Sequence, residues 1–134
     1  MARVNNRGLG GATSLIRHLQ ILRTVTEAVS RSLDLNEVIQ KSLGALTHVT
    51  GHEIASLHLV SSDGKMLLLR GERGLSDRLR EVNEMLPIGQ GLIGRVAASG
   101  RVRRVDEAGR ALDLLPAARA AVTADGIRGF LCVP

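Results

Sequence analysis

The chain has 134 residues, 44% of them hydrophobic, which is the size and apolar content of one domain with a packed core. It contains one Phe and no Trp or Tyr, so the core must be aliphatic, and the aromatic platforms of single-stranded nucleic-acid binders are absent. The net charge is +5, but the basic residues are scattered instead of forming a stripe, so we expect no nucleic-acid partner.

The apolar residues are also too dispersed for a membrane protein. No run of about 18 apolar residues occurs, which predicts that the chain has no membrane span. The first residues lack the apolar segment of a secretory signal, so we expect a cytoplasmic location. The single Cys132 excludes an internal disulfide, and its apolar neighbours favour a buried, inert thiol.

The first part of the chain predicts a disordered end followed by a helix. Residues 1–12 are rich in Gly and Asn and are expected to be disordered. Residues 13–32 carry apolar side chains three and four positions apart, which predicts an N-terminal linker or dimerisation helix. Leu15, Leu22 and Val29 lie seven positions apart, as one position of a coiled coil does. Two interpretations stay open: the stripe forms a dimer seam, or it packs on the domain's own sheet.

Residues 33–134 are expected to form the domain itself. Asp34 and Glu37 resemble a capping box, which predicts that a second helix begins there. Alternating apolar residues and turn signals predict the later elements. In chain order these are strands at 53–60 and 65–70, a short helix at 76–82, extended segments at 85–88 and 102–105, helical sequence at 106–124 interrupted by Pro116, and an extended run at 127–133.

A glycine motif stands between the third and fourth extended segments. Gly89, Gly91 and Gly94 spell G-x-G-x-x-G, which invites a nucleotide site. A dinucleotide fold needs a buried strand before the first glycine, and Pro87 disfavours one. A kinase glycine loop needs a lysine on the next strand, but Lys65 is the last lysine of the chain.

A structural interpretation suits the same residues better. Gly89 and Gly91 allow a tight turn at positive φ, and residues 92–98 then form a short helix that buries Ile93 and Val96. Gly100 fits the left-handed position that ends a helix.

With its neighbours, this stretch resembles the central signature of GAF domains, the small-molecule-sensing modules of bacterial signalling proteins. The resemblance covers nearly the whole chain, because the order and spacing of several segments also fit. They are Leu86–Arg101, Ser32–Ile39 (Ser-Leu-Asp-Leu-Asn-Glu-Val-Ile), Ala55–Gly64, Arg70–Ser76 and Gly126–Pro134.

The resemblance implies an α+β fold, a GAF/PAS-like antiparallel sheet flanked by helices and preceded by an N-terminal signalling helix. It also implies that the final strand and helix of the domain are missing, so that the chain is a fragment or a truncated gene product. The expected function is that of a small-molecule-sensing input module of a bacterial two-component sensor histidine kinase, acting as a homodimer. The alternative is a ligand-free dimerisation or adaptor module of another signalling protein or transcription regulator.

The resemblance further implies a ligand pocket between the sheet and the segments at 86–124. Which face of the first strand lines this pocket is open, because apolar and polar residues alternate there. The candidate pocket residues are Leu57, His58, Leu59, Ile93, Gly94, Val105, Asp106, Ala120 and Phe130.

No specific cofactor is implied. No histidine lies at 104–130, where haem-binding members of the family carry theirs, so haem is not expected. A bilin would need a cysteine in the roof segment, and Cys132 lies beyond it. No catalytic motif and no metal shell is found, and sulfoxide reductases of this fold use several cysteines, so we expect a regulatory domain and not an enzyme.

Overall fold

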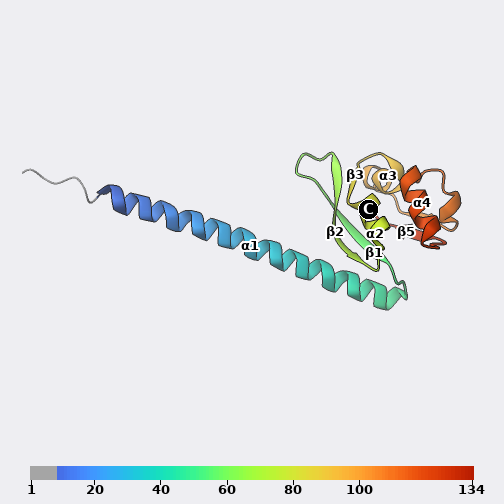
Figure 1. Cartoon of the computed structure of the whole chain (residues 1–134), viewed down its shortest axis with the longest axis horizontal. Coiled ribbons are helices and arrows are strands. Elements are labelled where there is room, and N and C mark those ends of the chain that lie inside the picture. The colour runs from blue at the N-terminus through green and yellow to red at the C-terminus, as the bar shows by residue number, and fades with distance from the viewer. Residues whose placement is uncertain (1–8) are drawn as a thin grey trace, which may run out of the picture. The chain divides into compact units, whose positions relative to one another are not determined.

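The computed structural model describes residues 9–134 (Figure 1). They divide into two compact units at the boundary between Val38 and Ile39. The elements are α1 (Leu9–Thr50), β1 (Ala55–Val60), β2 (Met66–Arg73), α2 (Asp77–Asn83), β3 (Met85–Pro87), α3 (Gly91–Ser99), β4 (Arg103–Val105), the 3-10 helix η1 (Ala108–Arg110), α4 (Pro116–Ala124) and β5 (Phe130–Cys132).

Helix α1 is a single element of 42 residues (Figure 1). The predicted start of a second helix at Asp34 is therefore wrong. No proline occurs before Pro87, so nothing in the sequence removes a backbone donor inside α1. Residues 9–12, expected to be disordered, belong to this helix, whereas residues 1–8 of that prediction lie outside the described residues. The expected domain boundary at residues 32 and 33 stays a prediction.

The strands form two antiparallel sheets, a three-stranded one with the order β1-β2-β3 and a two-stranded one made of β4 and β5. This confirms the mixed helix and sheet fold with an antiparallel sheet. In the first sheet the register between β1 and β2 shifts between Leu57 and His58. Such a bulge breaks strict alternation, and Leu57 and His58 are both half-buried as a result. The expected division of the first strand into two alternating faces is thus wrong at this point.

The last turns of α1 pack against β2 within the second unit. Ile39 and Leu43 are almost fully buried. A Cβ atom on Gly71 of β2 would overlap the Cγ2 of Ile39, so the absence of a side chain at Gly71 lets the helix approach the strand closely.

A second group of apolar side chains fills the space among the shorter helices. Its buried members are Leu79, Leu92, Val96, Ala108, Leu114, Ala121 and Val122. Ser76 links two of these helices, because its hydroxyl accepts from the backbone N–H of Leu79 and donates to the carboxylate of Asp125. It thereby caps α2 and ties it to the end of α4.

The glycine motif forms the turn that begins α3. Gly89 and Gly91 have φ values of 84° and 63°, and the N–H of Gly89 donates to the carbonyl of Gly94 at 2.8 Å. The backbone of Gly94 also passes so close to the carbonyl of Pro87 that no Cβ fits between them. Gly100 ends the helix in the left-handed region, as predicted. Val96 is buried as predicted, whereas Ile93, predicted to be buried with it, is half-buried, and Leu92 is the most buried side chain of the helix.

The segment before α4 differs from its expected helical structure. Residues 111–115 form a loop, and Pro116 begins α4 in its first turn and does not interrupt it. The guanidinium of Arg119 donates to the carbonyl of Ala111 at 3.0 Å and fixes this loop.

Replacing Gly94 with alanine tests the structural interpretation of the motif. Overpacking against the Pro87 carbonyl costs about 1–3 kcal/mol, which exceeds the gain of up to about 1 kcal/mol from alanine in a helix. We expect Gly94→Ala to lower the free energy of unfolding in urea denaturation. Gly109→Ala is the control, since its Cβ meets only the Thr123 hydroxyl at 3.4 Å. Equal stability of the two variants would contradict the interpretation.

Candidate functional site

The candidate pocket residues lie in different environments. Ile93, Val105 and Phe130 are half-buried and pack against the same apolar group of side chains. Gly94 is buried, but the carbonyl of Pro87 occupies the space in front of its Cα. Asp106, Ala120 and Leu59 are exposed. Binding of a ligand by these residues stays a prediction.

His58 is the candidate with the most distinct environment. Its Nε2 atom lies 2.9 Å from the carbonyl oxygen of Asn83, at the end of α2. Because a carbonyl only accepts, Nε2 carries the proton in this contact. Burial lowers the pKa of His58 from its ordinary value of 6.5, and the hydrogen bond to Asn83 opposes this only in part. The folded structure therefore favours the neutral form of this side chain.

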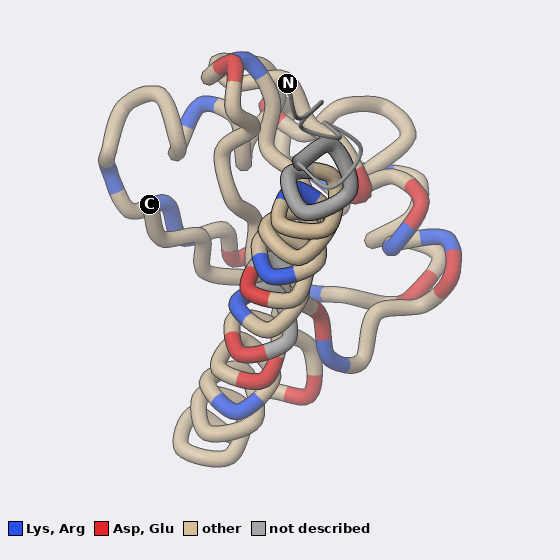
Figure 2. The backbone as a smooth tube through the Cα atoms, turned by 90° about the vertical axis from the view of Figure 1, so that its left-hand side faces the viewer, with Lys and Arg blue, Asp and Glu red and all other residues tan. Residues whose placement is uncertain are grey.

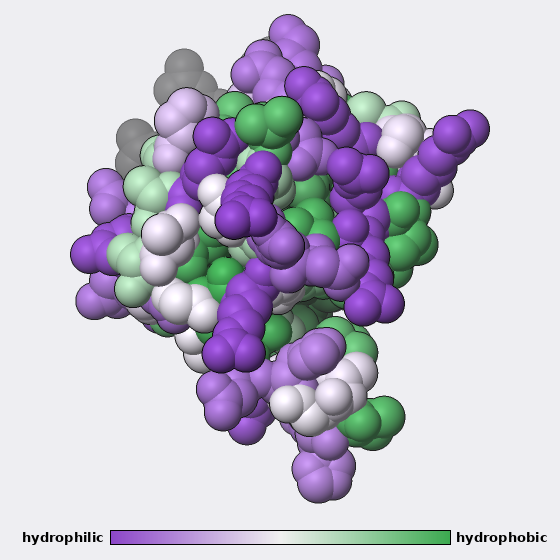
Figure 3. Space-filling model, turned by 90° about the vertical axis from the view of Figure 1, so that its right-hand side faces the viewer, coloured by the Kyte–Doolittle hydropathy of each residue, from purple (hydrophilic) through white to green (hydrophobic). Residues whose placement is uncertain are grey.

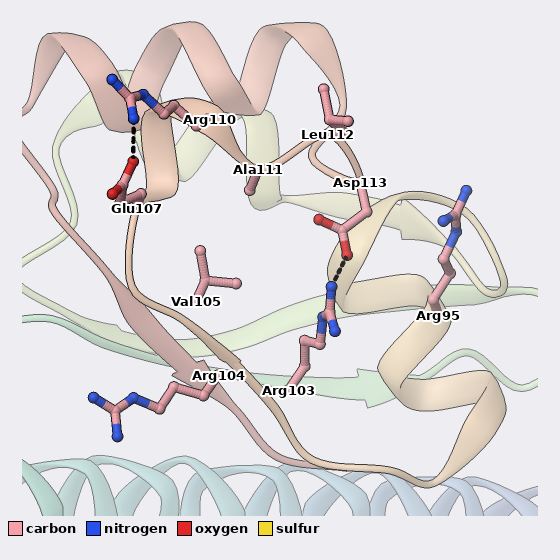
Figure 4. A pocket seen from close by; sticks show the side chains of 9 residues that line it. All are labelled: Arg95, Arg103, Arg104, Val105, Glu107, Arg110, Ala111, Leu112 and Asp113. Carbon is pink, nitrogen blue, oxygen red and sulfur yellow. Dashed lines mark ion pairs between the residues drawn. The ribbon is translucent and has the colours of Figure 1, made fainter.

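The domain has an open hollow of about 560 Å³ beside α3, β4 and the loop before α4 (Figure 4). Its lining residues are Arg95, Arg103, Arg104, Val105, Glu107, Arg110, Ala111, Leu112 and Asp113. Four arginines face two carboxylates in this set, so the lining has a surplus of positive charge. We call it the arginine hollow.

Ion pairs within the domain neutralise part of this positive charge. Arg103 lies 3.4 Å from Asp113, and Arg110 lies 2.9 Å from Glu107. Figure 4 shows the side chains of Arg103 and Asp113 pointing toward each other, while Arg104 extends away from both. Arg95 makes no ion pair with any described residue within 4.0 Å. Arg104 pairs with Asp106 at 2.8 Å. The contact of Arg103 with Asp113 is the longest of these three ion pairs. Arg95 and Arg103 are therefore the lining arginines that are most available to a ligand.

Sequence reasoning found only part of this hollow. The sequence shows arginines shortly after Gly100, but its basic residues are scattered, and no basic patch was predicted. It contained no sign that Arg95 and Asp113 would join Arg103, because their approach depends on how the chain turns at Gly100 and on the loop after η1. Of the candidate pocket residues, only Val105 lines the arginine hollow.

The apolar stripe of α1 is a second candidate surface, within the first unit. Leu15, Leu19, Leu22 and Val29 have exposed fractions of 62%, 60%, 65% and 53%. Their spacing of four, three and seven positions is that of a heptad seam. Acidic and basic residues are interspersed along the same helix in Figure 2, among them Arg23 and Glu27, which form an ion pair at 2.8 Å.

Elsewhere on the domain surface, hydrophobic and hydrophilic residues lie next to one another (Figure 3). Figure 3 shows hydrophobic residues bordered by hydrophilic ones on one face. Leu112 and Val133 are exposed by 88% and 63%.

Burial raises the pKa of the Cys132 thiol on β5 and so favours its protonated form. Within residues 9–134, no three His, Cys, Asp or Glu side chains gather so that they could hold a metal ion. No described helix combines the length and apolar character that crossing a bilayer requires.

The low pKa of His58 predicts a pH-dependent contribution to stability. The unfolded chain takes up the His58 proton at higher pH than the folded one, so this contribution is complete above about pH 6.5 and is lost as the pH falls below it. We expect urea denaturation between pH 7 and pH 5 to show a smaller loss of stability in His58→Gln than in the unaltered chain. His52→Gln, at an exposed position, is the control. The same pH profile in all three proteins would contradict the assignment.

Comparison with known families agrees with this architecture. No curated protein matches the chain at a significant level. The sequence model of the family described as GAF domain matches residues 18–134, which includes the glycine turn, both sheets and the arginine hollow. GAF domains are generally small-molecule-sensing or regulatory modules. The match covers most of the chain, and the chain belongs to the GAF domain family.

Proposed function

We propose that the chain is the sensing module of a bacterial two-component histidine kinase and that it acts as a dimer joined through α1. The observation that carries the proposal is the exposed apolar stripe on this helix. Exposed leucines at heptad spacing leave apolar area in water, and a second copy of the helix removes that area from water. The function is regulatory and not catalytic.

The end of α1 offers a route by which the domain can influence the seam. Ile39 and Leu43 belong to α1, and both pack on Gly71 of β2 without a side chain between them. A ligand that binds one arrangement of the domain better than another shifts the population of the two arrangements. A change in β2 packing then reaches the helix directly, because tightly packed groups do not deform independently.

A dimerisation or adaptor module without a ligand is the second candidate. The packing around Gly94 favours it, since the predicted pocket wall there is already filled by the carbonyl of Pro87. The exposure of Leu59 and Ala120 points the same way. Both functions require the α1 seam, but only the first requires a bound small molecule.

The seam can be tested by placing a charge in it. Burial of one leucine side chain in the seam contributes about 1.5–3 kcal/mol to the free energy of association. Leu22→Glu removes one such leucine from each of the two copies, so the dimer loses this contribution twice. We therefore expect the dimer dissociation constant to rise by about 100-fold or more, measured by sedimentation equilibrium.

Gln20→Glu is the matched control, because it adds the same charge two positions away, on the polar face of the same helix. The proposal requires that this control remains as dimeric as the unaltered chain. A monomeric unaltered chain, or equal dissociation constants for the two variants, would show that the stripe is not a seam.

A further inference from the structure

We propose that the arginine hollow binds a small organic anion through a phosphate or carboxylate group held between Arg95 and Arg103. The inference deepens the ligand-sensing function proposed above and rests on it. It assigns the class of the ligand and the residues that recognise its charge.

The arginine hollow has a surplus of positive charge that is open to solvent. Arg95 lines it from α3 without an ion pair to any described residue within 4.0 Å, and Arg103 lines it from β4. A guanidinium presents a planar fork of N–H donors that matches the oxygens of carboxylate and phosphate groups. Two such groups on one hollow can share an anion that neither holds alone.

The chain already places an anionic group of its own in the hollow. The carboxylate of Asp113 lies toward Arg103 at 3.4 Å (Figure 4). This is longer than the roughly 2.7–2.9 Å of a charge-assisted hydrogen bond, so the pair is loose. The side chain of Arg103 is 59% exposed and that of Asp113 is 20% exposed, so solvent reaches the arginine side of the pair and weakens it. An external anion can therefore displace Asp113 from Arg103 at small cost.

The hollow also offers space and apolar side chains for the rest of a ligand. Val105 and Ala111 line the hollow between the charged groups, and the volume of about 560 Å³ exceeds what one inorganic anion fills. These apolar side chains suit the carbon skeleton of an organic acid or a phosphate ester. Asp113 directly precedes Leu114, which belongs to the buried apolar group of the domain. Displacement of the Asp113 carboxylate would therefore change how Leu114 packs in that group.

The test is a calorimetric titration of the whole chain with inorganic phosphate and, separately, with succinate. Phosphate reports recognition of the phosphate group, and succinate reports recognition of a carboxylate with an apolar spacer. We expect saturable binding of at least one of the two. Arg95→Gln and Arg103→Gln should each weaken it about tenfold to a hundredfold, the loss typical of one hydrogen bond to a charged group.

Two further variants separate a built site from general attraction to a positive protein. Asp113→Asn removes the competing carboxylate and should tighten binding severalfold. Arg101→Gln lowers the net charge by the same amount as Arg103→Gln, but Arg101 does not line the hollow. The Arg101→Gln variant should therefore bind the probe with the affinity of the unaltered chain. Equal weakening by Arg101→Gln and Arg103→Gln, or no effect of Asp113→Asn, would overturn the inference.

Native mass spectrometry of the purified chain distinguishes failure of this inference from failure of the proposed function. A co-purified neutral or cationic molecule, without response to phosphate or succinate, overturns the anion site and leaves ligand sensing intact. A chain that carries no molecule and binds neither probe overturns both, and the dimerisation module then remains.

Discussion

The close approach of Gly94 to the carbonyl of Pro87 sets the position of much of the domain. It brings the backbone of α3 against the end of β3, and the hydrogen bond from Gly89 to Gly94 closes the turn between them. Once α3 begins there, Leu92 and Val96 point into the apolar group shared with α2 and α4. Its left-handed end at Gly100 then directs the chain into β4 and its arginines. The motif that suggested a nucleotide site is used for this backbone contact.

Local chemistry explains which elements the sequence could predict. The start of α2 at Ser76 and both ends of α3 depend on residues that are neighbours in the chain, and all were predicted closely. Continuity of α1 was missed because a capping pattern competes with helix propagation, and propagation wins where no proline or packing contact stops the helix.

Non-local packing accounts for the remaining differences. The bulge between Leu57 and His58 depends on the partner strand, and a sequence pattern with period two contains no sign of it. Likewise the arginine hollow joins Arg95 and Asp113 across the turn at Gly100 and the loop after η1. The candidate pocket residues were assigned by resemblance, and only Val105 lies in the hollow that the side chains form.

The two surfaces of functional interest differ in physical character. The stripe on α1 is apolar and exposed, so its association with a second copy would be driven by burial of area and would persist at high salt. The arginine hollow acts through charge, so salt screens its interactions. A module with both features can dimerise independently of its ligand and still respond to it.

Cysteine cross-linking along α1 tests the central claim, a dimer joined through the helix, most directly. The measurement compares Leu22→Cys with Gln20→Cys, each combined with Cys132→Ser so that the introduced thiol is the only cysteine. A parallel seam predicts rapid disulfide formation between two copies at position 22, because this stripe faces its partner, and slow formation at position 20. Equal rates at both positions, or no disulfide at either, would contradict the account.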